Sequence, residues 1–397
     1  MKVLFTTWAW RSHYFPMVPL GWAFLAAGHE VRVASRPGLV DDITGSGLPA
    51  VAVGPDLDFQ TVFREQIGNP LERTHDATQS LSEMRRTGRL ERVLRAIGVA
   101  RRYADAMADD ILAFAQTWRP DLVVFEPLNM AGPLVGKLLR VPTARHLWSA
   151  DFTGGIGEIE AEVTAPLAAR FGLQTLHLLG DVTVDPCPPS MQTPAPVRRE
   201  LMRYVPYNGR AMAPTWVLEP PVRPRVCLTW GTQTAGIGQN DLFLVSQVLG
   251  ALAGLDAEIV VAVTPEQRAQ LTEVPANARV LDEPLALHLW VGTCDLLIHQ
   301  GGSGTTMTSL LNGVPNLVLP QIMDQVFTAR QIASTGAGRY VQGSEATPGV
   351  VRDTVVEMLA DRRYQQAARE VGDEMRAMPP APSVVAALEG FAQASAN

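Results

Sequence analysis

Short runs of β-branched residues alternate with longer helical patterns along this chain, and the alternation starts again after a break rich in proline. This pattern is typical of parallel βαβ units, in which a buried strand is followed by a helix that covers the sheet. The expected strands span residues 3–7, 30–35, 50–53, 122–125 and 143–147, and then 226–230, 258–263, 296–299 and 317–319. They are mostly apolar, as a sheet covered on both faces requires. The sequence therefore predicts an α/β fold with two doubly wound parallel sheets.

The break between the two series holds ten prolines between Asp185 and Pro224, which indicates a linker zone. A chain of 397 residues also favours two domains, because one domain usually takes roughly 100 to 200 residues. We expect an N-terminal domain over residues 1–205, a linker over 206–224 and a second domain over 225–378. A final helix over 379–397 is expected to pack back on the first domain.

Composition excludes several classes of protein. The net charge of −7 argues against a general nucleic-acid binder. Three cysteines, odd in number and far apart, suggest neither a disulfide framework nor a metal site, and a cytoplasmic location fits them. Apolar stretches fall short of the roughly 18 to 20 residues that span a bilayer, and the first residues lack the features of a signal peptide. We expect no membrane-spanning helix.

One pair of carboxylates has the spacing that some sugar-transferring enzymes use to hold a metal ion, Asp56 and Asp58. Nearby carboxylates recur often by chance, and no histidine or cysteine cluster supports a metal elsewhere. A solvated loop is the favoured interpretation, so no metal is expected.

The most informative segment runs from Cys294 to Gln331. His299 ends an expected strand, and a glycine-rich turn follows, in which Ser303 and Thr305 open a helix. The N-terminus of a helix binds anions through free backbone N–H groups, so a diphosphate would fit, although a simple turn capped by Ser or Thr is the competing interpretation. His299 lies where ligands bind in open α/β sheets, and its ring can hydrogen-bond a phosphate oxygen. After the next strand, residues 324 and 325 add a carboxylate and an amide, which suit sugar hydroxyls.

Together with four other segments, this stretch resembles the family 1 glycosyltransferases of the GT-B fold, in particular bacterial enzymes that decorate antibiotics and other natural products. The other segments are FTTWAWRSHYFPMVPLGWAFLAAGHEV near the start, PDLVVFEP from Pro120, VPYNG from Val205 and RVCLTWGT from Arg225. The resemblance covers nearly the whole chain. It implies two Rossmann-like domains that face each other across a cleft.

The resemblance assigns the donor site residue by residue. The donor diphosphate would be held by His299, Gly301, Gly302, Ser303, Gly304 and Thr305, with Thr232 as a second contact. The sugar hydroxyls would be bound by Asp324 and Gln325. The chain departs from the family pattern at Gln300, where a second histidine is common, and at Thr328, where asparagine is usual. Residues 281–284 also lack the tryptophan on which the family commonly stacks the nucleobase.

On the N-terminal side, His13 follows the first strand and matches the family's general base, which takes the acceptor's proton. Glu126 stands where the family often has an aspartate that fixes the tautomer of this histidine. Aromatic residues are expected to line an apolar acceptor pocket, although core packing explains them equally well. They are Trp8, Trp10, Tyr14, Phe15, Trp148 and Phe152.

The predicted function is that of an inverting glycosyltransferase. It would move a deoxysugar from a dTDP-sugar to a polycyclic or macrocyclic natural-product acceptor in antibiotic biosynthesis, with the nucleotide sugar as co-substrate and no cofactor. A homodimer is left open, as is a bond to oxygen, nitrogen or carbon. A nucleotide-sugar epimerase and a non-catalytic nucleotide-sugar-binding partner are the alternatives, and incubating the donor with and without acceptor separates all three.

Overall fold

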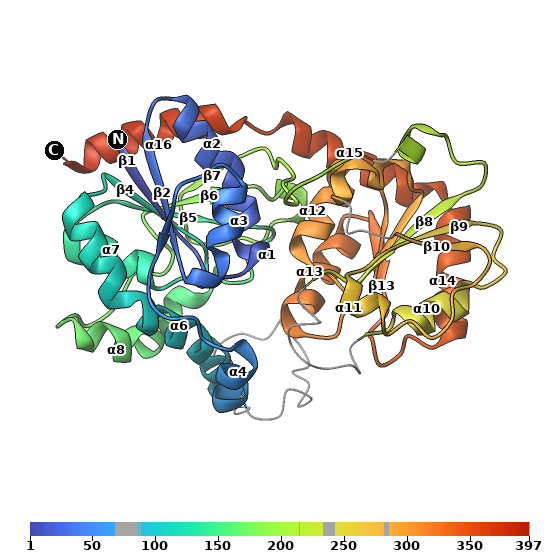
Figure 1. Ribbon diagram of the computed structural model, residues 1–397, viewed down its shortest axis with the longest axis horizontal. Helices are drawn as coiled ribbons and strands as arrows, with labels where there is room; N and C mark the ends of the chain where they lie inside the picture. Colours follow the sequence, from blue (N-terminus) through green and yellow to red (C-terminus); the bar gives the residue numbers. More distant parts are fainter. Residues whose placement is uncertain (68–85, 87–88, 214, 233–242, 282–285, 397) are drawn as a thin grey trace.

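The computed structural model describes residues 1–67, 86, 89–213, 215–232, 243–281 and 286–396. In this part of the chain two parallel sheets form, and the domains built on them lie side by side (Figure 1). The strand orders are β3-β2-β1-β4-β5-β6-β7 and β10-β9-β8-β11-β12-β13. In each sheet the first strand of the domain lies inside the sheet and the chain winds outward in both directions, so the predicted doubly wound α/β architecture is confirmed.

The first sheet is built from strands that are almost fully buried at its centre. Its strands are β1 (Lys2–Thr6), β2 (Glu30–Ser35), β3 (Ala50–Ala52), β4 (Leu122–Phe125), β5 (Thr143–His146), β6 (Val182–Asp185) and β7 (Arg199–Leu201). β1 pairs with β2 on one side and with β4 on the other. Segments that follow β1 and β4 therefore meet at one edge of the sheet.

Two of these strands were not expected. β6 ends where the proline-rich zone begins, and β7 lies inside it, so the prediction that residues 185–224 form a linker zone is wrong for its first part. Prolines surround β7 but none lies within it. β7 is the edge strand of the sheet and pairs on one side only, so the prolines beside it, which lack a backbone N–H, break few hydrogen bonds.

Helices cover both faces of this sheet. They are α1 (Arg11–Tyr14), α2 (Val18–Ala26), α3 (Val40–Gly45), α4 (Phe59–Ile67), α6 (Arg89–Trp118), α7 (Ala131–Leu139) and α8 (Glu160–Arg170). Short 3-10 turns span Phe15–Met17, Pro37–Leu39, Ile156–Ile159 and Pro189–Met191. The apolar sides of α6, α7 and α8 form one core with the sheet, and α2 and α3 form a second core on the opposite face.

The second domain repeats this layout. Its strands are β8 (Arg225–Thr229), β9 (Glu258–Ala262), β10 (Ala278–Val280), β11 (Leu296–His299), β12 (Asn316–Val318) and β13 (Gly338–Tyr340). Its helices are α10 (Val245–Leu252), α11 (Pro265–Arg268), α12 (Ser303–Leu311), α13 (Met323–Ser334), α14 (Pro348–Ala360) and α15 (Arg362–Ala377). Further 3-10 turns span Thr215–Leu218, Leu287–Leu289 and Val291–Thr293. One core includes α10 and α14, another includes α12, α13 and α15, and a third gathers around Trp290.

The last helix, α16 (Ala381–Ala396), leaves the second domain and lies along α2 of the first, so the chain ends near its beginning (Figure 1). Leu388 of α16 is fully buried in the core that contains α2, and Glu389 pairs with His29 at 2.6 Å. None of the helices that the structure describes is both long and apolar enough to cross a membrane.

Candidate active site

A histidine and a glutamate from distant parts of the sequence meet at the edge of the first sheet. His13 lies on α1, directly after β1, and Glu126 directly follows β4. The Nδ1 atom of His13 lies 3.3 Å from Oε2 of Glu126. The Glu126 side chain is fully buried and also accepts hydrogen bonds from the backbone N–H groups of Trp8 and Leu128, at 3.3 and 2.8 Å. Glu126 is therefore held in one orientation, toward the histidine.

The contact between the two side chains has the distance of an ion pair but not the angle of a good hydrogen bond, because Nδ1 of His13 lacks a partner of standard geometry. Catalytic hydrogen bonds are often long when substrates are absent and tighten when they bind. With Nδ1 toward the carboxylate, the Nε2 atom is the one that can take a proton. The pair thus has the arrangement of a carboxylate-oriented general base.

Aromatic rings surround this histidine. The ring of Trp8 is nearly parallel to the imidazole, with 5.2 Å between the ring centroids and 12° between the ring planes. Trp10 meets the imidazole edge-on, with 5.5 Å between the centroids. Trp148, which follows β5, lies 4.4 Å away. Phe152 packs against Trp148 and reaches Phe327 on α13 of the second domain, at 6.0 and 6.4 Å. Four of the six aromatic residues predicted for the acceptor pocket therefore lie around the base or beside it.

The other two, Tyr14 and Phe15, pack elsewhere: the assignment of Tyr14 to the acceptor pocket is wrong, and that of Phe15 stays a prediction. Tyr14 is fully buried in the core with α2, and its hydroxyl bonds Ser46 at 2.6 Å. Phe15 packs against Tyr207 at 4.9 Å. In a helix, successive side chains point about 100° apart, so the neighbours of His13 in sequence turn away from it.

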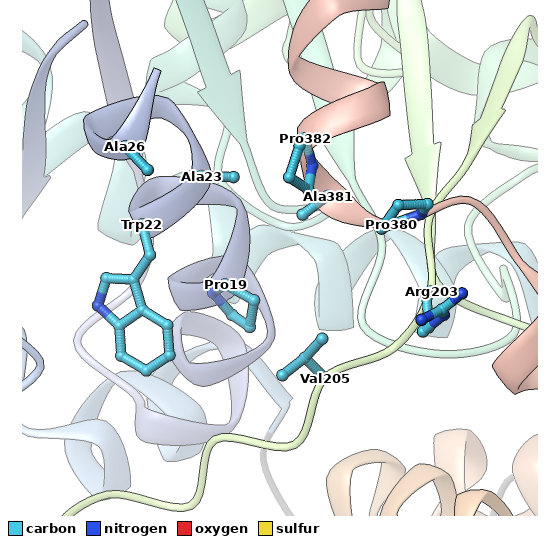
Figure 2. Close-up of a pocket in the computed structure, with 9 residues that line it drawn as sticks. All are labelled: Pro19, Trp22, Ala23, Ala26, Arg203, Val205, Pro380, Ala381 and Pro382. Atoms are coloured by element: carbon cyan, nitrogen blue, oxygen red, sulfur yellow. The ribbon is translucent and has the colours of Figure 1, made fainter. Parts of the chain in front are cut away.

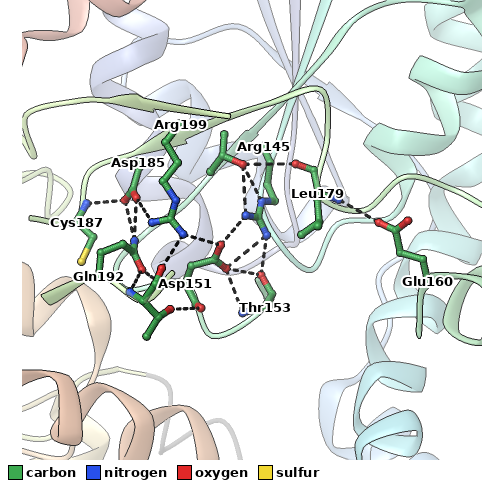
Figure 3. A network of polar contacts seen from close by, with 11 residues as sticks. Arg145, Asp151, Thr153, Glu160, Leu179, Asp185, Cys187, Gln192 and Arg199 are labelled. Carbon is green, nitrogen blue, oxygen red and sulfur yellow. Dashed lines mark hydrogen bonds and ion pairs between the residues drawn. The ribbon is translucent and has the colours of Figure 1, made fainter. Parts of the chain in front are cut away.

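A buried network of charges supports the segment that carries Trp148 and Phe152 (Figure 3). Arg145 on β5 donates to Asp151 at 2.6 Å, and both side chains are at most 1% exposed. Arg199 on β7 pairs with Asp185 at 2.8 Å and lies 3.7 Å from Asp151. Burial lowers the pKa of Arg145, and the Asp151 carboxylate opposes that shift. Two positive and two negative charges balance, which fixes the loops after β5 and β6.

In the second domain, a tight turn leads from β11 into α12. Gly301 has a φ of +106°, a conformation that favours glycine, and an added Cβ atom would lie 3.1 Å from atoms of Gln325 and Val318. Gly302 is the N-cap of α12, and no side chain caps the helix. The competing interpretation of a Ser- or Thr-capped turn is therefore wrong. The first backbone N–H groups of α12 have no acceptor within the helix and can bind an anion.

His299 does not point into this anion site. Its ring is fully buried, Nδ1 accepts the backbone N–H of Gly301 at 3.1 Å, and Nε2 lies 3.0 Å from Oδ1 of Asn316. Burial lowers its pKa to about 4, so the ring is neutral and Nε2 carries the proton. Both nitrogens are used within the protein. The prediction that His299 contacts the diphosphate is wrong in this geometry, and the ring instead holds the turn.

The residues that orient His299 were missed in the sequence. Oδ1 of Asn316 also accepts from the hydroxyl of Ser309 at 2.7 Å. Both are buried polar residues in apolar surroundings, a signal that marks hydrogen-bonded networks once burial is known. Gln300, at the position of the family's second histidine, is buried against Gly231 and Gly302.

The remaining donor residues are more open. Ser303, Gly304 and Thr305 are half-buried at the start of α12, and Thr232 is exposed in the turn after β8. The family's nucleobase-stacking tryptophan is expected at residues 281–284; Leu281 is buried there, and residues 282–284 lie outside the described part of the chain.

Asp324 and Gln325 open α13, one βα unit beyond the glycine turn. Asp324 is exposed, so a ligand can reach it, and it lies close enough to His13 of the first domain for the charge of a protonated ring to act on it. Partial desolvation by the groups around it raises the pKa of its carboxyl, while backbone N–H groups and a protonated His13 lower that pKa. Gln325 is buried, and its carbonyl accepts the backbone N–H groups of Gln321 and Ile322, which leaves its amide nitrogen for a ligand.

The two carboxylates with metal-like spacing serve local structure. Asp56 accepts the backbone N–H of Gly38 at 2.9 Å, and Asp58 accepts the N–H and hydroxyl of Thr61 near the start of α4. Among the residues that the structure describes, no group of three or more potential ligands could hold a metal ion.

An apolar groove lies apart from these groups, between α2 and the start of α16 (Figure 2). Trp22 of α2, Val205 and Pro380 line it, and Arg203 is the one charged residue in its described lining. It offers no acid–base pair.

Both domains match models of one protein family. Residues 22–231 match the N-terminal domain of the erythromycin biosynthesis protein CIII-like family, and residues 246–391 match its C-terminal domain. The chain belongs to the CIII-like family. Along nearly its whole length this CIII-like protein is similar to 10-deoxymethynolide desosaminyltransferase of Streptomyces venezuelae, with 36% identity over 99% of this chain and 97% of that protein. It is 37% identical to the TDP-daunosamine transferase DnrS of Streptomyces peucetius, over 98% and 96%.

Solved glycosyltransferases have the same fold. The structure of VinC in complex with dTDP superposes with a TM-score of 0.83 at 30% identity, covering 99% of this chain and all of that one. The spinosyn rhamnosyltransferase SpnG, complexed with spinosyn aglycone, has the same TM-score at 31% identity, covering 98% of this chain and all of that one. The CIII-like protein is therefore a GT-B glycosyltransferase, and its relatives transfer sugars to antibiotic aglycones.

Proposed function

We propose that this CIII-like enzyme is an inverting transferase that moves a deoxysugar from a dTDP-sugar to a hydroxyl of an apolar polyketide-type acceptor. The observation that carries the proposal is the opposition of His13, backed by Glu126, to the start of α13 in the other domain. His13 lies close enough to Asp324 for a protonated ring to lower the pKa of that carboxyl, and Phe152 contacts Phe327 three residues further along α13. The nucleotide in the VinC structure and the names of the relatives support dTDP as the carrier.

The chemistry follows from this opposition. The acceptor oxygen bonds to the anomeric carbon while its proton passes to Nε2 of His13, and Glu126 stabilises the imidazolium that forms. On the opposite face of the sugar, the bond from the anomeric carbon to the diphosphate oxygen breaks, and its electron pair leaves with the nucleoside diphosphate. Attack and departure on opposite faces invert the anomeric centre.

The leaving diphosphate would be stabilised at the N-terminus of α12. The uncapped N–H groups and the hydroxyls of Ser303 and Thr305 can donate to its oxygens, and the positive end of the helix dipole favours its charge. Asp324 and the amide of Gln325 would bind sugar hydroxyls. We propose that these donors replace a divalent metal and that the nucleotide sugar is the co-substrate.

The experiment that tests the proposal measures transfer by the His13→Ala variant. With a dTDP-sugar and an aliphatic alcohol acceptor, kcat should fall by about 10²-fold or more, the usual size of general base catalysis, while donor affinity measured by calorimetry stays the same. Wild-type turnover in the variant would contradict the role of His13. Conversion of the donor in the absence of acceptor would favour an epimerase instead.

A further inference from the structure

His13 has indole rings close to more than one side of its imidazole. Trp8 lies nearly parallel to it, and Trp148 approaches to 4.4 Å at an angle of 39°. In the described part of the chain, the rings of these two tryptophans do not contact each other. The two indoles therefore approach the imidazole from different sides, while Glu126 lies at Nδ1.

This setting matters because the histidine is shielded from water. Its side chain is only 10% exposed, so few water molecules can solvate a positive charge on the ring. The face of an indole carries negative potential and attracts a cation within about 6 Å, most strongly when water is excluded. Two carboxylates lie near the ring: Glu126 is in ion-pair contact with it, and Asp324 approaches from the second domain. The tryptophans add to these charges from the ring faces.

Both tryptophans are held in place by separate contacts. The backbone N–H of Trp8 donates to Glu126, so the residue that stacks on the base also orients its carboxylate. Trp148 precedes the loop that Asp151 fixes through Arg145 and through the backbone N–H and hydroxyl of Thr153 (Figure 3). The indoles therefore do not need to reorganise when the charge on His13 appears.

We propose that Trp8 and Trp148 are positioning residues that stabilise the protonated form of His13 during sugar transfer. The inference rests on the proposed role of His13 as the base. In the transfer step, positive charge develops on the ring when the acceptor hands over its proton, and an ionised acceptor has no proton to hand over. The benefit should therefore depend on the acidity of the acceptor, which a purely structural role of the tryptophans would not produce.

The test compares two acceptors with the Trp148→Leu variant. One is 7-hydroxy-4-methylcoumarin, assayed at mildly alkaline pH where its phenol is ionised, and the other is 7-(hydroxymethyl)coumarin, whose alcohol stays neutral. We expect kcat/KM for the alcohol to fall about tenfold more than for the phenolate, the size of a desolvated cation–π contact. Trp148→Phe keeps an aromatic face and should recover most of the loss.

Phe152→Leu is the matched control, because Phe152 lies in the same loop and packs on Trp148 but has no ring contact with His13 among the described residues. It should change kcat/KM for both acceptors by the same factor. Equal losses for both acceptors in Trp148→Leu, or an alcohol-specific loss in Trp148→Phe as large as in Trp148→Leu, would overturn the inference. Failure of the wild-type protein to glycosylate any acceptor would contradict the proposed function instead.

Discussion

The pH dependence of folding stability should report on His299, the residue that holds the turn before α12. Burial lowers the pKa of this ring to about 4, against about 6.5 in an unfolded chain. The unfolded state therefore binds the proton more readily, and the free energy of unfolding must fall as the pH falls from about 6.5 toward 4. Integrating this linkage between pH 7.5 and pH 5 gives a loss of about 2 kcal/mol from His299 alone.

The variant His299→Gln isolates this contribution, because glutamine can donate and accept hydrogen bonds but does not titrate. His146 is also fully buried, with its pKa lowered to about 4, so the wild-type protein should lose stability from both rings. Urea unfolding at pH 7.5 and pH 5 should show that the variant loses about 2 kcal/mol less than the wild type over this interval. Because all other titrating groups are the same in the wild type and the variant, their contributions to the pH dependence cancel in the difference.

His177 provides a control of opposite sign. Its hydrogen bond to Glu160 raises its pKa, so its contribution to stability is present at low pH and is lost as the pH rises. His177→Gln should therefore make the loss toward pH 5 slightly larger, not smaller. If His299→Gln and the wild type show the same pH dependence, the neutral, buried ring described here is wrong.

Three further predictions concern the charges and the donor site. Asp151→Asn should lower the free energy of unfolding by about 3–5 kcal/mol, because Arg145 keeps a buried charge without its carboxylate; urea unfolding measures this, and a change near zero would contradict it. Asp324→Ala should weaken binding of the nucleotide sugar by about 1–3 kcal/mol and leave binding of the bare nucleoside diphosphate unchanged. Thr305→Ala should weaken binding of both ligands. Calorimetry that finds equal losses for the two ligands in the Asp324 variant would refute the sugar-binding role of Asp324. Full activity is expected in excess EDTA, and activity that only magnesium or manganese restores would return attention to Asp56.

Sequence patterns alone determined the architecture. Short apolar runs alternate with helical patterns of period about 3.6 residues along this chain, and this alternation located most of the strands. β7 was not predicted, because three residues of intermediate burial at the edge of a sheet carry almost no periodic signal. Its strand character comes from pairing with β6, a contact that local composition does not encode.

The site could be predicted only in part, because contacts between distant segments are not encoded in local composition. Ends of parallel strands mark where ligands bind, so His13, the turn after His299 and Asp324 could be named from the chain. The orientation of each side chain could not. Trp8 faces the base while Tyr14 turns into the core, and the ring of His299 turns inward to Asn316.

Local sequence thus determined most of the elements, their order and the residue types at the strand ends. Tertiary structure alone decided which side chains meet. Glu126 reaches His13 because β4 pairs with β1, and Asp151 neutralises Arg145 because the loop after β5 folds back over its own strand. Such contacts are set by long-range strand pairing and by the requirement that a buried charge have a partner, and neither leaves a periodic trace in the sequence.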